Sequence, residues 1–303
     1  MQYIKMTDGI KIAVYEIGPK GGQRTVFLVH GWPLSHKIYE YQAELLVRNG
    51  YRVVMLDLRG FGMSDAPASG YTYNRMARDL YEVIAALRLR DLVLVGFSMG
   101  GAIVLRYMRM FKGFAVSRLL LLAAAAPCWT QRPDFPYGLT RAYVDDLIRL
   151  TETDRPQLCE NFSQQLFASP QSKAAVDWFR EIALSSSGMG TLGALTALRN
   201  EDGRRDLQSV HVPTAILYGE KDQVVTPDLI RIQNEGIRGS KLYTLPQSGH
   251  GVMYDQLGLF NQYYSGSIVS DNRRIWRCIH RSGLIYTGSV GRRKPGESFA
   301  CIF

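Results

Sequence analysis

One short segment strongly limits what this chain can fold into: a serine between glycines, at a point where an apolar run meets a helical run. The segment is Gly96-Phe97-Ser98-Met99-Gly100. The run 92–95 before it favours a buried strand, and the run 101–110 after it favours a helix. So sharp a turn leaves room only for glycine two positions before and two after the serine. The spacing therefore predicts a strand–serine–helix turn that lifts the Ser98 hydroxyl above a sheet.

The rest of the chain alternates short apolar runs with helical periods, which favours a mostly parallel sheet with helices on both faces. Residues 3–17 predict a hairpin that turns at Asp8-Gly9. A helix is expected at 73–89, where apolar residues recur at helical spacing. Further strands are expected at 25–29, 51–56, 92–95, 118–124, 214–218 and 241–245.

Residues 128–206 interrupt this alternation. They contain helix-like segments, at 140–150, 173–184 and 190–199, and no clear strand. We interpret them as a helical cap inserted over the carboxyl edge of the sheet. The core would then consist of residues 1–127 and 207–266.

The segment 267–303 differs from the rest. The closing helix expected here gives way after Asn261-Gln262 to serine, glycine, arginine and scattered aromatics, and no period of 2 or 3.6 is sustained from Ser267 onward. We interpret 267–303 as an atypical tail that is disordered or non-native. A genuine extension, vector-derived sequence and translation out of frame remain open as its origin.

The net charge of +9 does not indicate a nucleic-acid partner, because seven basic and two acidic residues fall in 267–303, which leaves +4 for the other 266 residues. No apolar run approaches the roughly 20 residues of a membrane helix. The first residues lack the pattern of a secretory signal. Four cysteines without CxxC spacing favour reduced thiols. We therefore expect a cytoplasmic protein with no nucleic-acid partner and no membrane contact.

A serine hydroxyl is a poor nucleophile unless a base removes its proton. Of the five histidines, His250 is the best candidate, because it follows the last predicted strand at the carboxyl edge of the sheet. Asp222 follows the preceding strand and would hold the imidazole in the right tautomer. Glu220 is a nearby competitor for that role. A surface-loop histidine and a turn aspartate are the simpler interpretations.

Negative charge on a tetrahedral intermediate needs backbone N–H donors. The turn offers the N–H of Met99. The second donor should come from the loop His30-Gly31-Trp32-Pro33 after the strand 25–29, where Trp32 would donate its amide. The Trp32 side chain would wall the pocket or pack in the core.

Together these motifs resemble the α/β-hydrolase superfamily over residues 1–262. HGWP with GFSMGG is most similar to the branch that contains carboxylesterases, arylesterases and cofactor-free haloperoxidases or perhydrolases. The resemblance implies a triad of Ser98, Asp222 and His250, an oxyanion hole from Trp32 and Met99, and a cap at 128–206 over an acyl pocket. The motifs are HGWP (30–33), DLRGFGMSD (57–65), GFSMGG (96–101), GEKD (219–222) and GHG (249–251).

We therefore expect an α/β-hydrolase fold and a serine hydrolase that cleaves small to medium carboxylic esters through an acyl-enzyme intermediate. The expected partner is a small-molecule ester. Serine in place of aspartate at position 98 argues against dehalogenase or epoxide-hydrolase chemistry. The chain has no HExxH motif and no nucleotide-binding fingerprint, so we expect no metal and no cofactor. Perhydrolysis by the same triad, and ligand sensing or stress signalling with slow or single turnover, stay open as alternatives.

Overall fold

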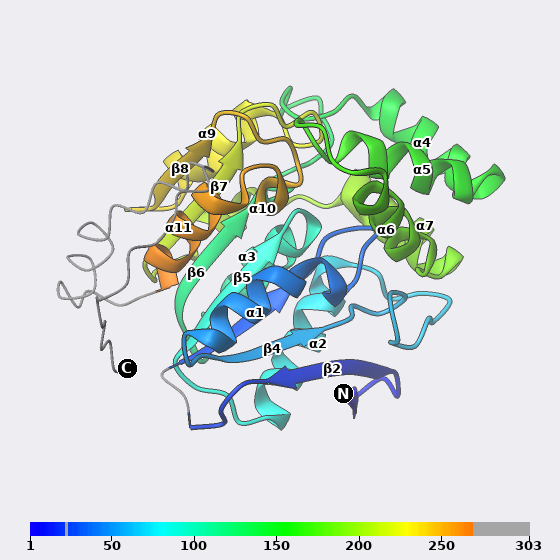
Figure 1. Cartoon of the computed structure of the whole chain (residues 1–303). Coiled ribbons are helices and arrows are strands. Elements are labelled where there is room, and N and C mark those ends of the chain that lie inside the picture. The colour runs from blue at the N-terminus through cyan, green and yellow to red at the C-terminus, as the bar shows by residue number, and fades with distance from the viewer. Residues whose placement is uncertain (22–23, 269–303) are drawn as a thin grey trace, which may run out of the picture. The chain divides into compact units, whose positions relative to one another are not determined.

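An eight-stranded sheet forms the centre of the computed structural model, which describes residues 1–21 and 24–268 (Figure 1). The strand order is β1-β2-β4-β3-β5-β6-β7-β8. The β1–β2 and β2–β4 pairs are antiparallel and all other pairs are parallel. The strands are β1 (Gln2–Lys5), β2 (Lys11–Ile17), β3 (Thr25–Val29), β4 (Arg52–Leu56), β5 (Leu92–Phe97), β6 (Val116–Leu122), β7 (Thr214–Gly219) and β8 (Lys241–Leu245).

The predicted hairpin and the six further predicted strands are all present, which confirms the predicted mostly parallel sheet. Helices connect the strands. They are η1 (His36–Tyr39), α1 (Glu40–Arg48), α2 (Tyr73–Ala86), α3 (Met99–Met110), α4 (Arg141–Thr153), α5 (Arg155–Gln165), α6 (Lys173–Leu184), α7 (Gly188–Asn200), α8 (Arg204–Leu207), α9 (Pro227–Gly236), α10 (Val252–Asp255) and α11 (Leu257–Ile268). None of the helices described here is long and apolar enough to cross a membrane.

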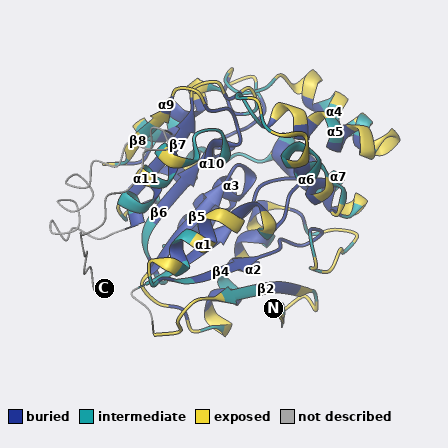
Figure 2. Ribbon diagram, in the orientation of Figure 1, coloured by how far each residue is buried: buried dark blue, intermediate teal, exposed yellow. Residues whose placement is uncertain are grey.

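Burial explains why the central strands form where they do. All six residues of β5 are buried, and so are all six of β7. A strand covered on both faces needs a continuous apolar run rather than alternation, which is what the sequence provides. The central strands accordingly form the dark, buried interior in Figure 2.

Helix α2 combines a start signal with an apolar stripe. The Thr72 hydroxyl accepts a hydrogen bond from the Arg75 N–H at 3.2 Å, which caps the first turn. Met76, Leu80 and Val83 are buried on one side of the helix. Their helical spacing fixes the face that packs on the protein interior.

The segment between β6 and β7, predicted as a helical insertion, forms α4 to α8. Helices α4 to α7 lie together beside the sheet (green in Figure 1). Helix α7 is tied to the core at its start, because the N–H and the hydroxyl of Ser187 both donate to the carbonyl of Gly60 at 2.9 Å. Gly60 follows β4, so a core loop supports this helix directly.

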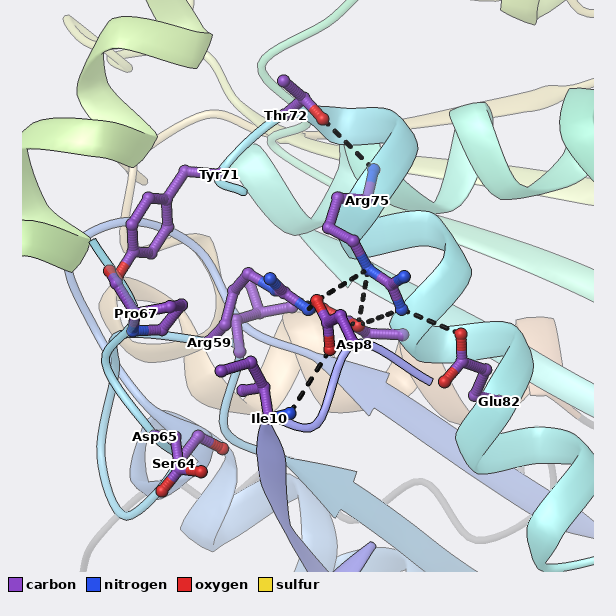
Figure 3. A network of polar contacts seen from close by, with 12 residues as sticks. Asp8, Ile10, Arg59, Ser64, Asp65, Pro67, Tyr71, Thr72, Arg75 and Glu82 are labelled. Carbon is purple, nitrogen blue, oxygen red and sulfur yellow. Dashed lines mark hydrogen bonds and ion pairs between the residues drawn. The ribbon is translucent and has the colours of Figure 1, made fainter. Parts of the chain in front are cut away.

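A buried ionic network fixes the loop after β4. Arg59 is almost fully buried and donates from Nε and Nη2 to both carboxylate oxygens of Asp79 in α2, at 2.7 and 2.8 Å. Nη2 also donates to Asp8 in the β1–β2 turn at 2.8 Å. Figure 3 shows Arg59 and Arg75 converging on Asp8. The network therefore joins the hairpin, the β4 loop and α2.

The closing helix corrects one expectation. The sequence predicted that helical order ends after Asn261-Gln262, but α11 continues through Ile268. Phe260, Tyr264 and Ile268 are its buried residues, and their spacing of four places them on one face. The prediction was wrong because serine and glycine between these residues mask the stripe. The remainder of the predicted tail, 269–303, lies outside the described residues.

Candidate active site

The structure brings Ser98, His250 and Asp222 together at the carboxyl ends of β5, β8 and β7. His250 Nε2 lies 2.9 Å from Ser98 Oγ, and His250 Nδ1 lies 2.8 Å from Asp222 Oδ2. Ser98 and Asp222 are 6% and 7% exposed, and His250 is fully buried. The three groups thus form a continuous hydrogen-bonded chain that is shielded from solvent.

The backbone at Ser98 is strained, as the predicted turn requires. Ser98 has φ +53° and ψ −121°, a conformation that costs about 1–3 kcal/mol for a non-glycine residue. Close packing holds it there. A Cβ on Gly100 would lie 2.3 Å from the carbonyl oxygen of Val29, and one on Gly96 would lie 2.6 Å from that of Gly100. The glycines are therefore required by the neighbouring backbone.

The surroundings of Asp222 fix which oxygen faces the imidazole. Its Oδ1 accepts from the N–H groups of Val224 and Val225 at 2.7 and 2.9 Å, so Oδ2 is directed to His250. A carboxylate can only accept, so Nδ1 of His250 carries the proton and Nε2 is free to accept the proton of Ser98. This is the tautomer that a general base needs.

The two predicted oxyanion donors lie beside Ser98. Met99 is the first residue of α3, and the N–H groups of a first turn have no partner within their helix. The Trp32 loop runs close to Ser98, since a Cβ on Gly31 would lie 2.8 Å from Ser98 Cβ. The Trp32 indole N–H donates to the carbonyl of Thr191 in α7 at 2.9 Å, which ties this loop to the helices between β6 and β7.

His30 supports this loop and was not among the predicted site residues. Its Nε2 lies 2.9 Å from the N–H of Leu58 and must accept from it. Nδ1 therefore carries the proton and donates to the carbonyl of Gly31 at 2.8 Å. Because the Gly31–Trp32 peptide is planar and trans, holding this carbonyl also fixes the direction of the Trp32 N–H. A His-Gly pair directly after a buried strand is the sequence signal for this role.

Burial lowers the pKa of His30 to about 4, against about 6.5 in an unfolded chain. Between pH 6.5 and 4, His30 becomes protonated in the unfolded chain but stays neutral in the folded protein. The stabilisation by neutral His30 is thus complete above pH 6.5 and declines as the pH falls towards 4, by about 3 kcal/mol in total. We expect urea unfolding midpoints to show this decline.

His30→Gln should flatten the decline between pH 6.5 and 4, because glutamine does not titrate. The exposed His211 provides the control, and His211→Gln should keep the slope of the unsubstituted protein. Equal slopes in the His30 and His211 variants would contradict the assignment.

A cavity of about 200 Å³ adjoins Ser98. Among the residues that the structure describes, no charged side chain lines this cavity; its wall is mostly apolar and carries a few amides and one phenol. This volume lies below the roughly 300–1,000 Å³ of pockets for drug-sized ligands. The residues around it are Trp32, Ser98, Trp129, Leu139, Tyr143, Leu147, Leu158, Asn161, Phe162, Gln165, Leu198, Gln223 and Val224.

Helix α5 supplies Leu158 and Phe162 to this cavity but was not predicted as a separate helix. Its sequence is mostly polar, so its apolar stripe is short. A start signal was present nonetheless. Asp154 caps the helix by accepting from the Gln157 N–H at 3.1 Å, and Pro156 stands in the first turn.

The amino-acid sequence matches a known protein family and a related protein of known sequence. Residues 24–257 match the family described as alpha/beta hydrolase fold. The AB hydrolase superfamily protein YisY of Bacillus subtilis is 42% identical over 254 residues, which cover 84% of this chain and 94% of that protein.

Two solved structures are similar throughout the described fold. An esterase from Exiguobacterium antarcticum has 40% identity and a TM-score of 0.84, over 87% of this chain and 97% of that one. A bromoperoxidase from Bacillus anthracis has 32% identity and a TM-score of 0.81, over 84% and 94% of the two chains.

Proposed function

The chain belongs to the alpha/beta hydrolase fold family, and we propose that it is a serine esterase for short carboxylic esters. The observation that carries the proposal is the hydrogen-bonded chain from Ser98 through His250 to Asp222, which borders an uncharged cavity. The similarity to an esterase at 40% identity supports the same reaction.

In the proposed reaction Ser98 Oγ forms a bond to the ester carbonyl carbon while its proton passes to His250 Nε2. The N–H groups of Trp32 and Met99 stabilise the resulting oxyanion. Collapse of the tetrahedral intermediate breaks the bond to the alcohol, which takes the proton from His250. Water then loses a proton to His250 and attacks the acyl-enzyme, which releases the acid and restores the Ser98 hydroxyl.

The cavity supports a substrate that is small and neutral near the reacting carbonyl. A charged group would lose its hydration there without an opposite charge to compensate, which is costly. Asn161, Gln165 and Gln223 offer only neutral hydrogen-bonding groups. We therefore place the small to medium esters expected from the sequence at the short end of that range.

Perhydrolysis is a second candidate, favoured by the similarity to a bromoperoxidase. The acyl-enzyme would be the same, and hydrogen peroxide would replace water as the acceptor, giving a peracid. The two reactions therefore differ only in the second half. Their ratio is measured by adding peroxide to a steady-state assay and following peracid formation.

The test of the proposal is a series of p-nitrophenyl esters of increasing acyl length. We expect sustained turnover, with kcat/KM highest for acetate to butyrate and at least about 10-fold lower for octanoate, because each excluded methylene costs about 0.8 kcal/mol of burial. A single stoichiometric burst would favour ligand sensing. A preference for long chains would contradict the small cavity.

A further inference from the structure

The carboxylate of Asp255 joins the loop that carries His250 to a cap segment more than 80 residues earlier in the chain. Its Oδ2 accepts from the N–H of Gly249 at 2.7 Å and from that of Ala168 at 3.0 Å. Its Oδ1 accepts from the N–H and the hydroxyl of Ser169 at 3.0 and 2.6 Å. One side chain thus receives hydrogen bonds from both sides of the junction between cap and core.

The two backbones are also in direct contact at this junction. The N–H of Gly251 donates to the carbonyl of Leu166 at 2.6 Å. A Cβ on Gly249 would lie 2.9 Å from the backbone nitrogen of Ala168. The residues on both sides of His250 therefore lie against the segment that follows α5.

The hydrogen bonds to Asp255 are stronger than neutral ones. Both oxygens of the Asp255 carboxylate accept from N–H groups, and hydrogen bonds to a carboxylate are roughly twice as strong as bonds between neutral groups. Gln171 adds a further donor, since its Nε2 lies 3.3 Å from Oδ1. Asp255 itself does not border the cavity beside Ser98.

We propose that Asp255 is a positioning residue that aligns His250 with Ser98 and makes this alignment depend on docking of the cap segment 166–171. The inference rests on the proposed esterase function. Gly249 directly precedes His250, so a fixed Gly249 N–H limits where the imidazole lies. A displacement of about 1 Å at a reacting group lowers the rate by about 10²-fold.

Asp255→Asn tests this alignment. In the asparagine side chain an NH₂ group replaces one of the two carboxylate oxygens. This group donates and cannot accept, so the hydrogen bonds that the replaced oxygen accepted are lost. We expect kcat for p-nitrophenyl acetate to fall about 10- to 100-fold. KM should change little, because the cavity wall is untouched. Active sites are counted by titration with a fluorophosphonate, so that kcat refers to reactive protein only.

Ser169→Ala provides a second variant, which removes the hydrogen bonds of the Ser169 hydroxyl to Asp255, at 2.6 Å to Oδ1 and 3.5 Å to the carbonyl oxygen, and keeps the Ser169 N–H. Ser169 touches neither the triad nor the cavity, yet we expect kcat to fall severalfold. Since Ser169 acts through Asp255, the double variant should be no slower than Asp255→Asn alone. Asp177→Asn is the matched control, because it makes the same chemical change in α6 at a carboxylate that pairs with Lys173 and Arg180; it should leave kcat unchanged.

The rate at which the fluorophosphonate labels Ser98 gives an independent readout, because labelling requires an aligned His250 but no turnover. Unchanged labelling and kcat in both variants, with only a lower Tm, would overturn the inference. Additive effects of the two substitutions would overturn the coupling to the cap. Absence of ester turnover in the unsubstituted protein would contradict the esterase proposal alone, and the labelling rates would still decide the role of Asp255.

Discussion

Ser98→Ala is expected to remove ester hydrolysis, with kcat falling by up to about 10⁶-fold. In the proposed reaction the hydroxyl supplies the attacking oxygen, and alanine offers no atom to form the acyl-enzyme. The fold should remain, because within residues 1–21 and 24–268 the hydroxyl of Ser98 is hydrogen-bonded only to His250, and the Cβ is retained. The measurement is multiple turnover on p-nitrophenyl acetate, together with a thermal melt.

Ser117→Ala is a matched control for this substitution. Its hydroxyl donates to the carbonyl of Leu92 at 3.1 Å, at the amino end of β5, away from the nucleophile. This variant should keep full activity. Sustained turnover by Ser98→Ala, at a rate near that of the control, would rule out Ser98 as the nucleophile.

Asp222→Asn should lower kcat by about 10⁴-fold through the tautomer of His250. The amide oxygen can still accept from Val224 and Val225, so the local loop is preserved. The amide nitrogen then faces Nδ1 and donates to it, which places the imidazole proton on Nε2. In that tautomer His250 cannot accept the proton of Ser98.

The competitor identified from the sequence is the control for this experiment. Glu220 is exposed at the end of β7, and no hydrogen bond joins its side chain to His250 in the described structure. Glu220→Gln should therefore leave kcat unchanged. A large loss in Glu220→Gln with a small loss in Asp222→Asn would reverse the assignment of the acid.

The sheet is predicted well because each central strand, such as β5, is a continuous apolar run. Such a run identifies a buried strand from the local sequence alone, before the neighbouring strands are known. The triad candidates are predictable for a related reason. Ser98 directly follows β5, Asp222 and His250 lie in the loops after β7 and β8, and parallel strands bring their carboxyl ends together.

What could not be predicted depends on contacts between distant segments. The hydrogen bonds of Asp255 to Ala168 and Ser169 join residues that are 87 and 86 positions apart. The proton position on His30 follows from Leu58, 28 positions away. Helix α5 is stabilised by packing on the other cap helices, and its own stripe is too short to reveal it.

The helices between β6 and β7 are not all held equally firmly to the rest of the fold, and this affects which substitutions the protein can accept. Ser187 and Thr191 tie α7 to the core, and Asp255 ties the segment after α5. Helix α4, by contrast, buries only Val144 and Thr151.

Yet α4 and the start of α5 supply Tyr143, Leu147 and Leu158 to the wall beside Ser98. Substitutions in α4 and at the start of α5 change the size of the cavity beside Ser98. They leave unchanged the strands and loops that hold Ser98, His250 and Asp222. For the proposed esterase, the accepted ester can therefore change in a descendant lineage while Ser98, His250 and Asp222 keep their places.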